Sequence, residues 1–119
     1  MGAPMTSAAI DRATYDGLVE STGDEFVCEL VDTFLAEAPR MLDELRDAYA
    51  KDDAERFRRA AHSLKSNANT FGALTLGRLA RELELGGLAP IRSAAAAPID
   101  AAASEYARVS QALEELTRG

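Results

Sequence analysis

One histidine, His62, is the residue of this sequence with the clearest chemical potential. It lies in a segment whose apolar residues recur at three- and four-residue intervals, at Phe57, Ala61, Leu64, Ala68 and Phe71. At about 100° per residue, His62 projects about 140° away from the middle of this stripe, toward solvent. Four polar side chains project within about 60° of it: Arg58, Lys65, Ser66 and Asn69. The periodicity therefore predicts an exposed histidine with two cations and a small residue beside it.

The surroundings of His62 restrict the chemistry that it can perform. The chain has one histidine and one cysteine, Cys28, so a zinc-type site would lack nearby ligands. Nucleophilic catalysis by a Ser/His/Asp arrangement needs a buried orienting acid and a pocket, which an exposed helix face does not readily offer. These two site types are therefore disfavoured.

Direct attack by the imidazole is a third possibility. A free imidazole has a pKa near 6.5, so most of it is a neutral nucleophile at neutral pH. It can attack phosphorus and become a phosphoramidate, while Lys65 and Arg58 would offer positive charge to the phosphoryl oxygens. The small Ser66 would let a partner approach the ring closely. This combination favours a carrier of phosphoryl groups over a free-standing enzyme.

The histidine segment is one of several amphipathic helices that the sequence predicts. Asp11 is placed to cap a short first helix, running roughly from Arg12 to Ser21. Asp24 then caps a long helix that reaches about Ala50. Pro39 lies inside its apolar pattern and predicts a kink or a break into two segments.

The remaining helices have equally clear boundaries, with one exception. Asp52 or Asp53 caps the histidine helix, and Gly72 ends it. The next helix has Leu76, Leu79, Ala80 and Leu83 inside and stops at Gly86-Gly87. The last helix begins near Ser93 with a kink, or at Pro98 as a first-turn proline. An all-α fold follows: an antiparallel up-and-down four-helix bundle with a short additional N-terminal helix.

Length and composition fit one domain without a membrane span. The chain has 119 residues, 47% of them hydrophobic, and a net charge of −7, which argues against nucleic acid or anionic lipid as partner. No apolar run approaches the roughly 20 residues that cross a bilayer, and the first five residues lack the basic start and the apolar stretch of a signal peptide. We expect a flexible N-terminus over residues 1–9, with 1–4 a cloning remnant, a domain over residues 10–119, and a cytoplasmic location.

A family resemblance completes the sequence evidence. The run Ala61-His62-Ser63-Leu64-Lys65-Ser66, followed by Gly72-Ala73, resembles the signature of histidine-containing phosphotransfer (HPt) domains. The wider frame is similar too: Gly23-Asp24 opens the long helix, Asp52-Asp53 precedes the histidine helix, and Leu83-Glu84 closes the next one. The resemblance extends roughly from Ile10 to Leu116.

The resemblance implies a monomeric bundle that works in a phosphorelay with response-regulator receiver domains and a hybrid histidine kinase. In that family a histidine takes a phosphoryl group from one receiver's aspartyl phosphate and passes it to another receiver's aspartate. His62 would be the phosphoacceptor at Nε2, with Lys65 assisting electrostatically and Ser66 at a position that is often glycine. Gly72 would be the structural glycine. The chain would bind no cofactor, since the receiver would supply the Mg²⁺.

The resemblance also implies an apolar docking patch beside the histidine. The long helix begins with more apolar residues than one inward stripe requires, and Leu18, Val31 and Leu35 are candidates for such a patch. The alternative is that the short first helix covers them. Arg58 and Asn69 are equally compatible with an ordinary solvated face.

Two other functions are consistent with the same signature. One is an interaction module that binds a receiver or kinase without carrying phosphate. The other is the substrate domain of a chemotaxis-type kinase, phosphorylated by a separate ATP-binding domain. The chain has no Gly-rich nucleotide loop, so it would not phosphorylate itself.

Overall fold

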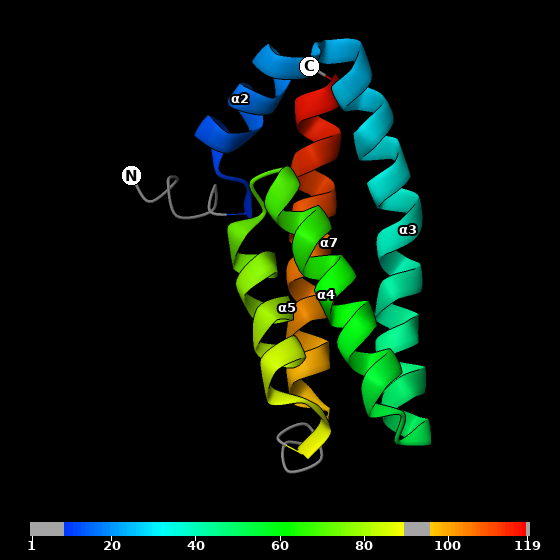
Figure 1. The fold of residues 1–119 in the computed structure, drawn as a ribbon. Helices are drawn as coiled ribbons and strands as arrows, with labels where there is room; N and C mark the ends of the chain where they lie inside the picture. The colour runs from blue at the N-terminus through cyan, green and yellow to red at the C-terminus, as the bar shows by residue number, and fades with distance from the viewer. Residues whose placement is uncertain (1–8, 90–95, 119) are drawn as a thin grey trace.

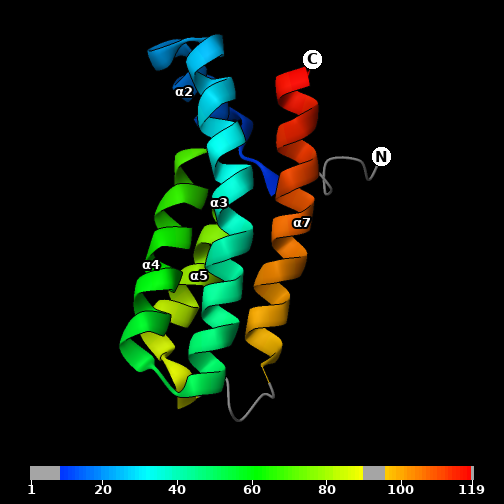
Figure 2. The ribbon, with the colours of Figure 1, turned by 90° about the vertical axis from the view of Figure 1, so that its right-hand side faces the viewer.

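The described residues fold into long α-helices without a β-strand. The computed structural model describes residues 9–89 and 96–118. Its helices are α2 (Arg12–Thr22), α3 (Asp24–Lys51), α4 (Ala54–Thr70), α5 (Leu74–Gly86) and α7 (Ala97–Arg118). The four longer helices run along the molecule, and α2 lies at the end where α3 begins (Figures 1 and 2). The prediction of an all-α fold is confirmed.

The core is built from the apolar stripes of these helices. All five predicted stripe residues of the histidine helix are at most 3% exposed: Phe57, Ala61, Leu64, Ala68 and Phe71. The ring of Phe34, on α3, contacts two other aromatic rings. Its centroid lies 5.3 Å from that of Phe71, at the end of α4, and 5.9 Å from that of Tyr106, on α7. Because this stripe is fixed in the core, the opposite face of α4 is fixed toward solvent.

The helix starts follow the predicted caps with one correction. The side chain of Asp11 accepts a hydrogen bond from the Thr14 backbone N–H, and Asp53 accepts one from that of Arg56. The prediction that Asp24 caps the long helix is wrong, because the cap position is Gly23, whose φ of 93° joins α2 to α3 in a single residue. Asp24 instead lies in the first turn of α3, where its carboxylate interacts favourably with the helix dipole.

Pro39 does not break the long helix. The helix continues from Asp24 to Lys51 with the proline inside it. A proline has no N–H, so the carbonyl of Leu35, four residues earlier, loses its helical partner. The Tyr106 hydroxyl of α7 donates a long hydrogen bond to that carbonyl at 3.4 Å. A tertiary contact thus compensates for the missing backbone bond, and the alternative of two separate segments is wrong.

Gly72 ends the histidine helix as predicted and also holds the N-terminal region. Its φ is 84°, and its carbonyl accepts a hydrogen bond from the Asp11 N–H at 2.7 Å. A Cβ at this position would lie 2.7 Å from the Asp11 carbonyl oxygen, so a side chain would force the two segments apart.

The last helix and the chain ends account for the remaining predictions. Helix α7 begins at Ala97 and has Pro98 in its first turn, as one of the two predicted starts of the last helix requires. The other alternative, a start near Ser93, and the predicted flexible N-terminus up to residue 8 lie outside the described residues. No helix in residues 9–89 and 96–118 combines the length and the apolar character needed to cross a membrane.

Candidate functional site

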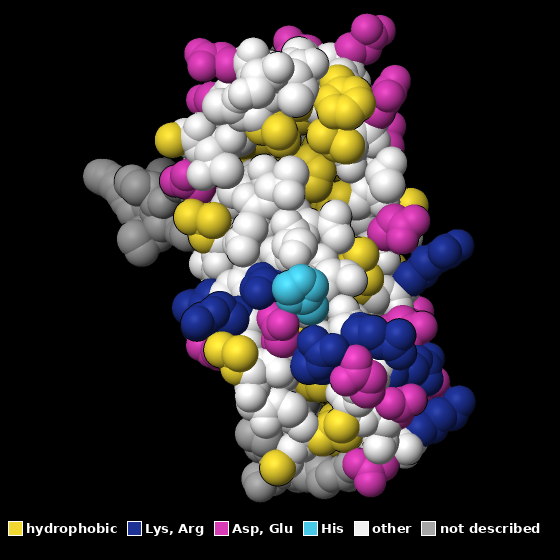
Figure 3. Space-filling view, in the orientation of Figure 1, with side chains coloured by type: hydrophobic (Ala, Val, Ile, Leu, Met, Phe, Trp, Pro, Cys, Tyr) yellow, Lys and Arg dark blue, Asp and Glu magenta, His cyan; other side chains and the backbone are white. Residues whose placement is uncertain are grey.

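His62 lies on the exposed face of α4, with its side chain 55% exposed (Figure 3). Its Nδ1 lies 2.9 Å from Oε2 of Glu84, on α5. Glu84 is much less accessible, with a side chain 13% exposed. The histidine is therefore held on one side by a nearly buried carboxylate from the neighbouring helix, and its other side is open to solvent.

Lys65 completes a three-residue group around this carboxylate. Its Nζ lies 3.1 Å from Oε1 of Glu84, so the two carboxylate oxygens serve different partners. The Lys65 ammonium first, and the His62 hydrogen bond second, hold the pKa of the Glu84 carboxyl below its ordinary value. Glu84 is consequently ionised at neutral pH; its Oε2 accepts a hydrogen bond from His62, and its Oε1 forms an ion pair with the Lys65 ammonium.

The ionised Glu84 determines which nitrogen of His62 can react. A carboxylate only accepts hydrogen bonds, so the ring nitrogen that faces it, Nδ1, must carry the hydrogen. In the neutral ring, Nε2 then keeps its lone pair. A nucleophilic nitrogen is thereby oriented away from Glu84, toward the solvent side of the ring.

Close packing of α4 against α5 brings Glu84 to His62. Gly77 of α5 is buried and faces Asn69 of α4, whose side chain fills the space where a Cβ of residue 77 would stand. The absence of a side chain at Gly77 thus allows Asn69 to pack between the helices. Asn69, a candidate accessory residue, therefore contributes to the packing of α4 against α5.

The other predicted neighbours of His62 have different surroundings. Arg58 donates to Glu55 on its own helix at 2.6 Å, and within residues 9–89 and 96–118 it forms no hydrogen bond with His62. Ser66 is exposed, and its backbone carbonyl accepts from the Thr70 hydroxyl at 3.0 Å. Of the two predicted cations, Lys65 belongs to the histidine group and Arg58 to a local pair.

The structure corrects one predicted docking residue, Val31, and leaves Leu18 and Leu35 as predictions. Val31 is 1% exposed and belongs to the core, because it points in the same direction as Val27 and Phe34. Leu18 and Leu35 are half-buried, but Leu35 lies about 180° around α3 from Phe26. Phe26 itself is 49% exposed. The sequence signal for it was the surplus of apolar residues at the start of the long helix.

Exposed apolar side chains lie on the same face of the molecule as His62. Figure 3 shows them over α2 and the first half of α3, with the histidine below them and a band of Lys and Arg side chains at its level. A groove of about 340 Å³ between α3 and α4 contains Leu30, Met41 and Phe71 in its lining. Leu30 and Met41 of α3 thus give the groove beside the histidine helix an apolar part, and Phe26 is exposed on the first turn of the same helix.

Glu84 is the site residue that sequence reasoning missed. It appeared there only as part of the frame that closes a helix, 22 residues from His62. Helical periodicity relates residues three and four positions apart, so it does not predict a partner on another helix. Within the described part of the chain, no three His, Cys, Asp or Glu side chains come together to hold a metal ion.

Comparisons with known proteins agree with this geometry. The family model of the Hpt domain matches residues 29–119. The chain is similar to the crystal structure of histidine-containing phosphotransfer protein B (HptB) from Pseudomonas aeruginosa PAO1, at 28% sequence identity and a TM-score of 0.83. That similarity covers 92% of this chain and 95% of the other. A comparison with curated proteins finds no match. Because the Hpt match extends over most of its length, this chain belongs to the Hpt family, and its role is histidine phosphotransfer in phosphorelay signalling.

Proposed function

We propose that His62 is the phosphoacceptor and that Nε2 is its reacting atom. The observation that carries this proposal is the 2.9 Å contact between His62 Nδ1 and the nearly buried Glu84 carboxylate. It orients the ring and leaves Nε2 accessible. Lys65, in contact with the same carboxylate, supplies positive charge beside the ring.

The transfer step follows from this arrangement. The Nε2 lone pair forms a bond to phosphorus while the bond from phosphorus to the aspartyl oxygen of a receiver domain breaks. The electron pair of that bond leaves with the aspartate. The phosphorylated ring keeps its Nδ1 hydrogen and becomes cationic, so the facing Glu84 carboxylate stabilises it. Attack by a second receiver's aspartate reverses these changes and frees the histidine.

The partner completes the chemistry, and this chain acts as a carrier, not an independent catalyst. The receiver holds the Mg²⁺ that neutralises the phosphoryl oxygens, and this chain contributes the histidine and the Lys65 charge. Receivers dock on Leu18, Phe26 and Leu30, beside the histidine helix, and a hybrid kinase is the source of phosphate. The carrier works as a cytoplasmic monomer, with α3, α4, α5 and α7 as an antiparallel up-and-down bundle and α2 at one end.

Phosphotransfer from a labelled receiver tests this function. The purified chain is incubated with Mg²⁺ and each of several phosphorylated receivers from the source organism. We expect an acid-labile, alkali-stable label on the wild-type chain and none on His62→Gln. Ser63→Ala, which alters the adjacent exposed position, should keep the label. Circular dichroism checks that both variants are folded.

The same experiment separates transfer from simple binding. If the wild-type chain binds receivers but never becomes labelled, it is an interaction module, and the proposed transfer is refuted. Label that survives in His62→Gln would move the phosphoacceptor to another residue.

A further inference from the structure

The net negative charge of this chain comes from one segment. Residues 13–39 contain seven Asp and Glu residues and no Lys or Arg, whereas the rest of the chain contains thirteen of each sign. The whole net charge of −7 is therefore located in residues 13–39, which we call the acidic segment. It comprises most of α2 and the first half of α3.

Six of the seven carboxylates of the acidic segment have no ion-pair partner among the residues that the structure describes. Only Asp16 forms an ion pair, with Arg12 at 3.4 Å. The other six form none with the described residues, and all are exposed: Glu20, Asp24, Glu25, Glu29, Asp32 and Glu37. Carboxylates farther along the chain, such as Glu44 and Glu55, are paired with arginines. The charge of the acidic segment is thus available to a partner.

This charge surrounds apolar surface next to the histidine helix. Glu29 follows Phe26 by three residues, so the two side chains are neighbours on the helix face, and Phe26 is 49% exposed. Glu37 lines the α3–α4 groove together with Leu30 and Met41. Figure 3 shows the apolar side chains with acidic ones around them.

The same groove becomes basic farther along. A second cavity, of about 420 Å³, shares Glu37 and Met41 with the first. Its other charged lining residues are three arginines and one glutamate: Arg40, Arg56, Arg59 and Glu44. The face that carries His62 therefore has an acidic, apolar half and a basic half. A partner that covers both halves must present cations to the first.

We propose that the acidic segment selects receiver domains whose contact helix carries Lys or Arg around its apolar residues. This inference rests on the proposed function and names the charge of its partner. Unpaired carboxylates around an apolar contact attract a basic rim, accelerate encounter and disfavour an acidic rim by like-charge repulsion. Anionic lipid and nucleic acid are repelled by the same surface. No three of the acids converge on a metal position in the described residues.

Matched charge reversals test the proposal. Glu29→Lys/Glu37→Lys reverses two carboxylates beside the apolar patch, and Glu114→Lys/Glu115→Lys makes the same charge change on α7. Those two glutamates are also exposed, and α7 lies on the side of the molecule away from α4 (Figure 2). The measured quantities are the Kd for the unphosphorylated receiver and the kcat/KM of phosphotransfer. Two receivers are compared, one with a basic and one with an acidic contact helix.

For the basic receiver, we expect the first variant to lower kcat/KM about tenfold or more at low salt, with the loss shrinking at high salt. The α7 variant should stay within about twofold of wild type, and the acidic receiver should gain from the first variant. Equal effects of the two variants, or a loss that salt does not change, would overturn the proposal. If His62 is labelled normally while these effects are absent, this inference fails and the proposed function stands. If no receiver labels His62, the function itself fails.

Discussion

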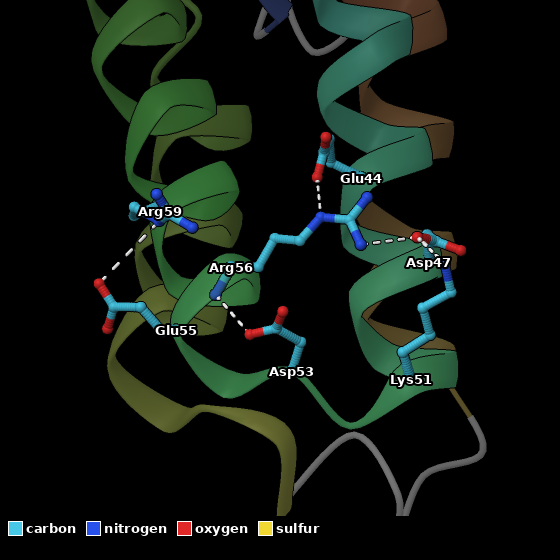
Figure 4. A network of polar contacts seen from close by, with 7 residues as sticks. All are labelled: Glu44, Asp47, Lys51, Asp53, Glu55, Arg56 and Arg59. Atoms are coloured by element: carbon cyan, nitrogen blue, oxygen red, sulfur yellow. Dashed lines mark hydrogen bonds and ion pairs between the residues drawn. The ribbon is translucent and has the colours of Figure 1, made fainter.

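Helix α4 carries two groups of charged side chains that join it to its neighbours, and they are organised in opposite ways. At its start, the Arg56 guanidinium lies between two carboxylates of α3, 2.5 Å from Glu44 and 2.6 Å from Asp47 (Figure 4). Midway along, the Glu84 carboxylate of α5 lies between two nitrogen side chains, His62 and Lys65. The first group has a cation at its centre and the second an anion.

Because of this difference, the Arg56 group is a structural contact between helices, whereas the Glu84 group leaves a reactive nitrogen available. In the Arg56 group, both acids point at a guanidinium that cannot lose its charge, and Lys51 adds a further contact to Asp47 at 3.3 Å. In the Glu84 group, each partner has a part left over: Nε2 of the histidine and the remaining hydrogens of the lysine ammonium. A nucleophile becomes available because the central anion uses only one side of each partner.

Removal of Lys65 should have the largest effect on transfer. We expect Lys65→Ala to lower the phosphotransfer rate by about 100-fold, because a positioned charge beside the migrating phosphoryl group is lost. Rapid-quench kinetics with a phosphorylated receiver measure the rate. Lys51→Ala, which removes a lysine of the Arg56 group, is the control and should leave it unchanged. Equal rates in the two variants would show that the groups do not differ as described.

Neutralising Glu84 should have a smaller effect on the same rate. We expect Glu84→Gln to slow transfer about tenfold, since an amide orients the ring less strongly and does not stabilise a cationic ring. Nitrogen NMR of His62 should show a loss of the preference for hydrogen on Nδ1. Glu82→Gln, which changes an exposed acid paired with Arg78 on the same helix, is the control. An unchanged tautomer in Glu84→Gln would contradict the orienting role.

Substitution of Arg56 should affect stability and leave transfer intact. Arg56→Met keeps much of the apolar stem and removes both ion pairs to α3. Because partly exposed ion pairs contribute little, we expect a fall in Tm of a few degrees and an unchanged transfer rate. Thermal unfolding and the kinetic assay together check this. A variant with normal Tm and slow transfer would reverse the assignment of the two groups.

The smallest expected effect is the loss, at acidic pH, of the contribution of Glu84 to stability. The pKa of Glu84 is lowered from its ordinary 4.5 in the folded chain, so the contribution of Glu84 to stability is present above that value. It is lost as the pH falls through the lower folded-state pKa. The difference in free energy of unfolding between wild type and Glu84→Gln should therefore be constant near neutral pH and shrink in acid. Urea unfolding at pH 7 and pH 3 measures it, and a difference that grows in acid would have the wrong sign.

The predictions from sequence succeeded where the causes are local. The Asp11 and Asp53 caps, the exposed face of His62 and the end of its helix at Gly72 depend on residues a few positions apart. Glu84 and the core position of Val31 depend on how separate helices pack. Periodicity predicts the direction of the α3 stripe only approximately, and a small angular error was enough to assign the buried Val31 to the docking surface.

The hydrogen bond from Tyr106 to the Leu35 carbonyl has a consequence for the alignment of the chain ends. It joins residues 71 positions apart, at the one carbonyl of α3 that Pro39 deprives of its helical partner. If α7 moved along α3 by one helical turn, about 5.4 Å, the hydroxyl would face carbonyls already bonded within the helix. The Leu35 carbonyl would then be unpaired. Pro39 therefore leaves one carbonyl of α3 free to accept a hydrogen bond, and the bond from Tyr106 favours a single axial register of α7 against α3.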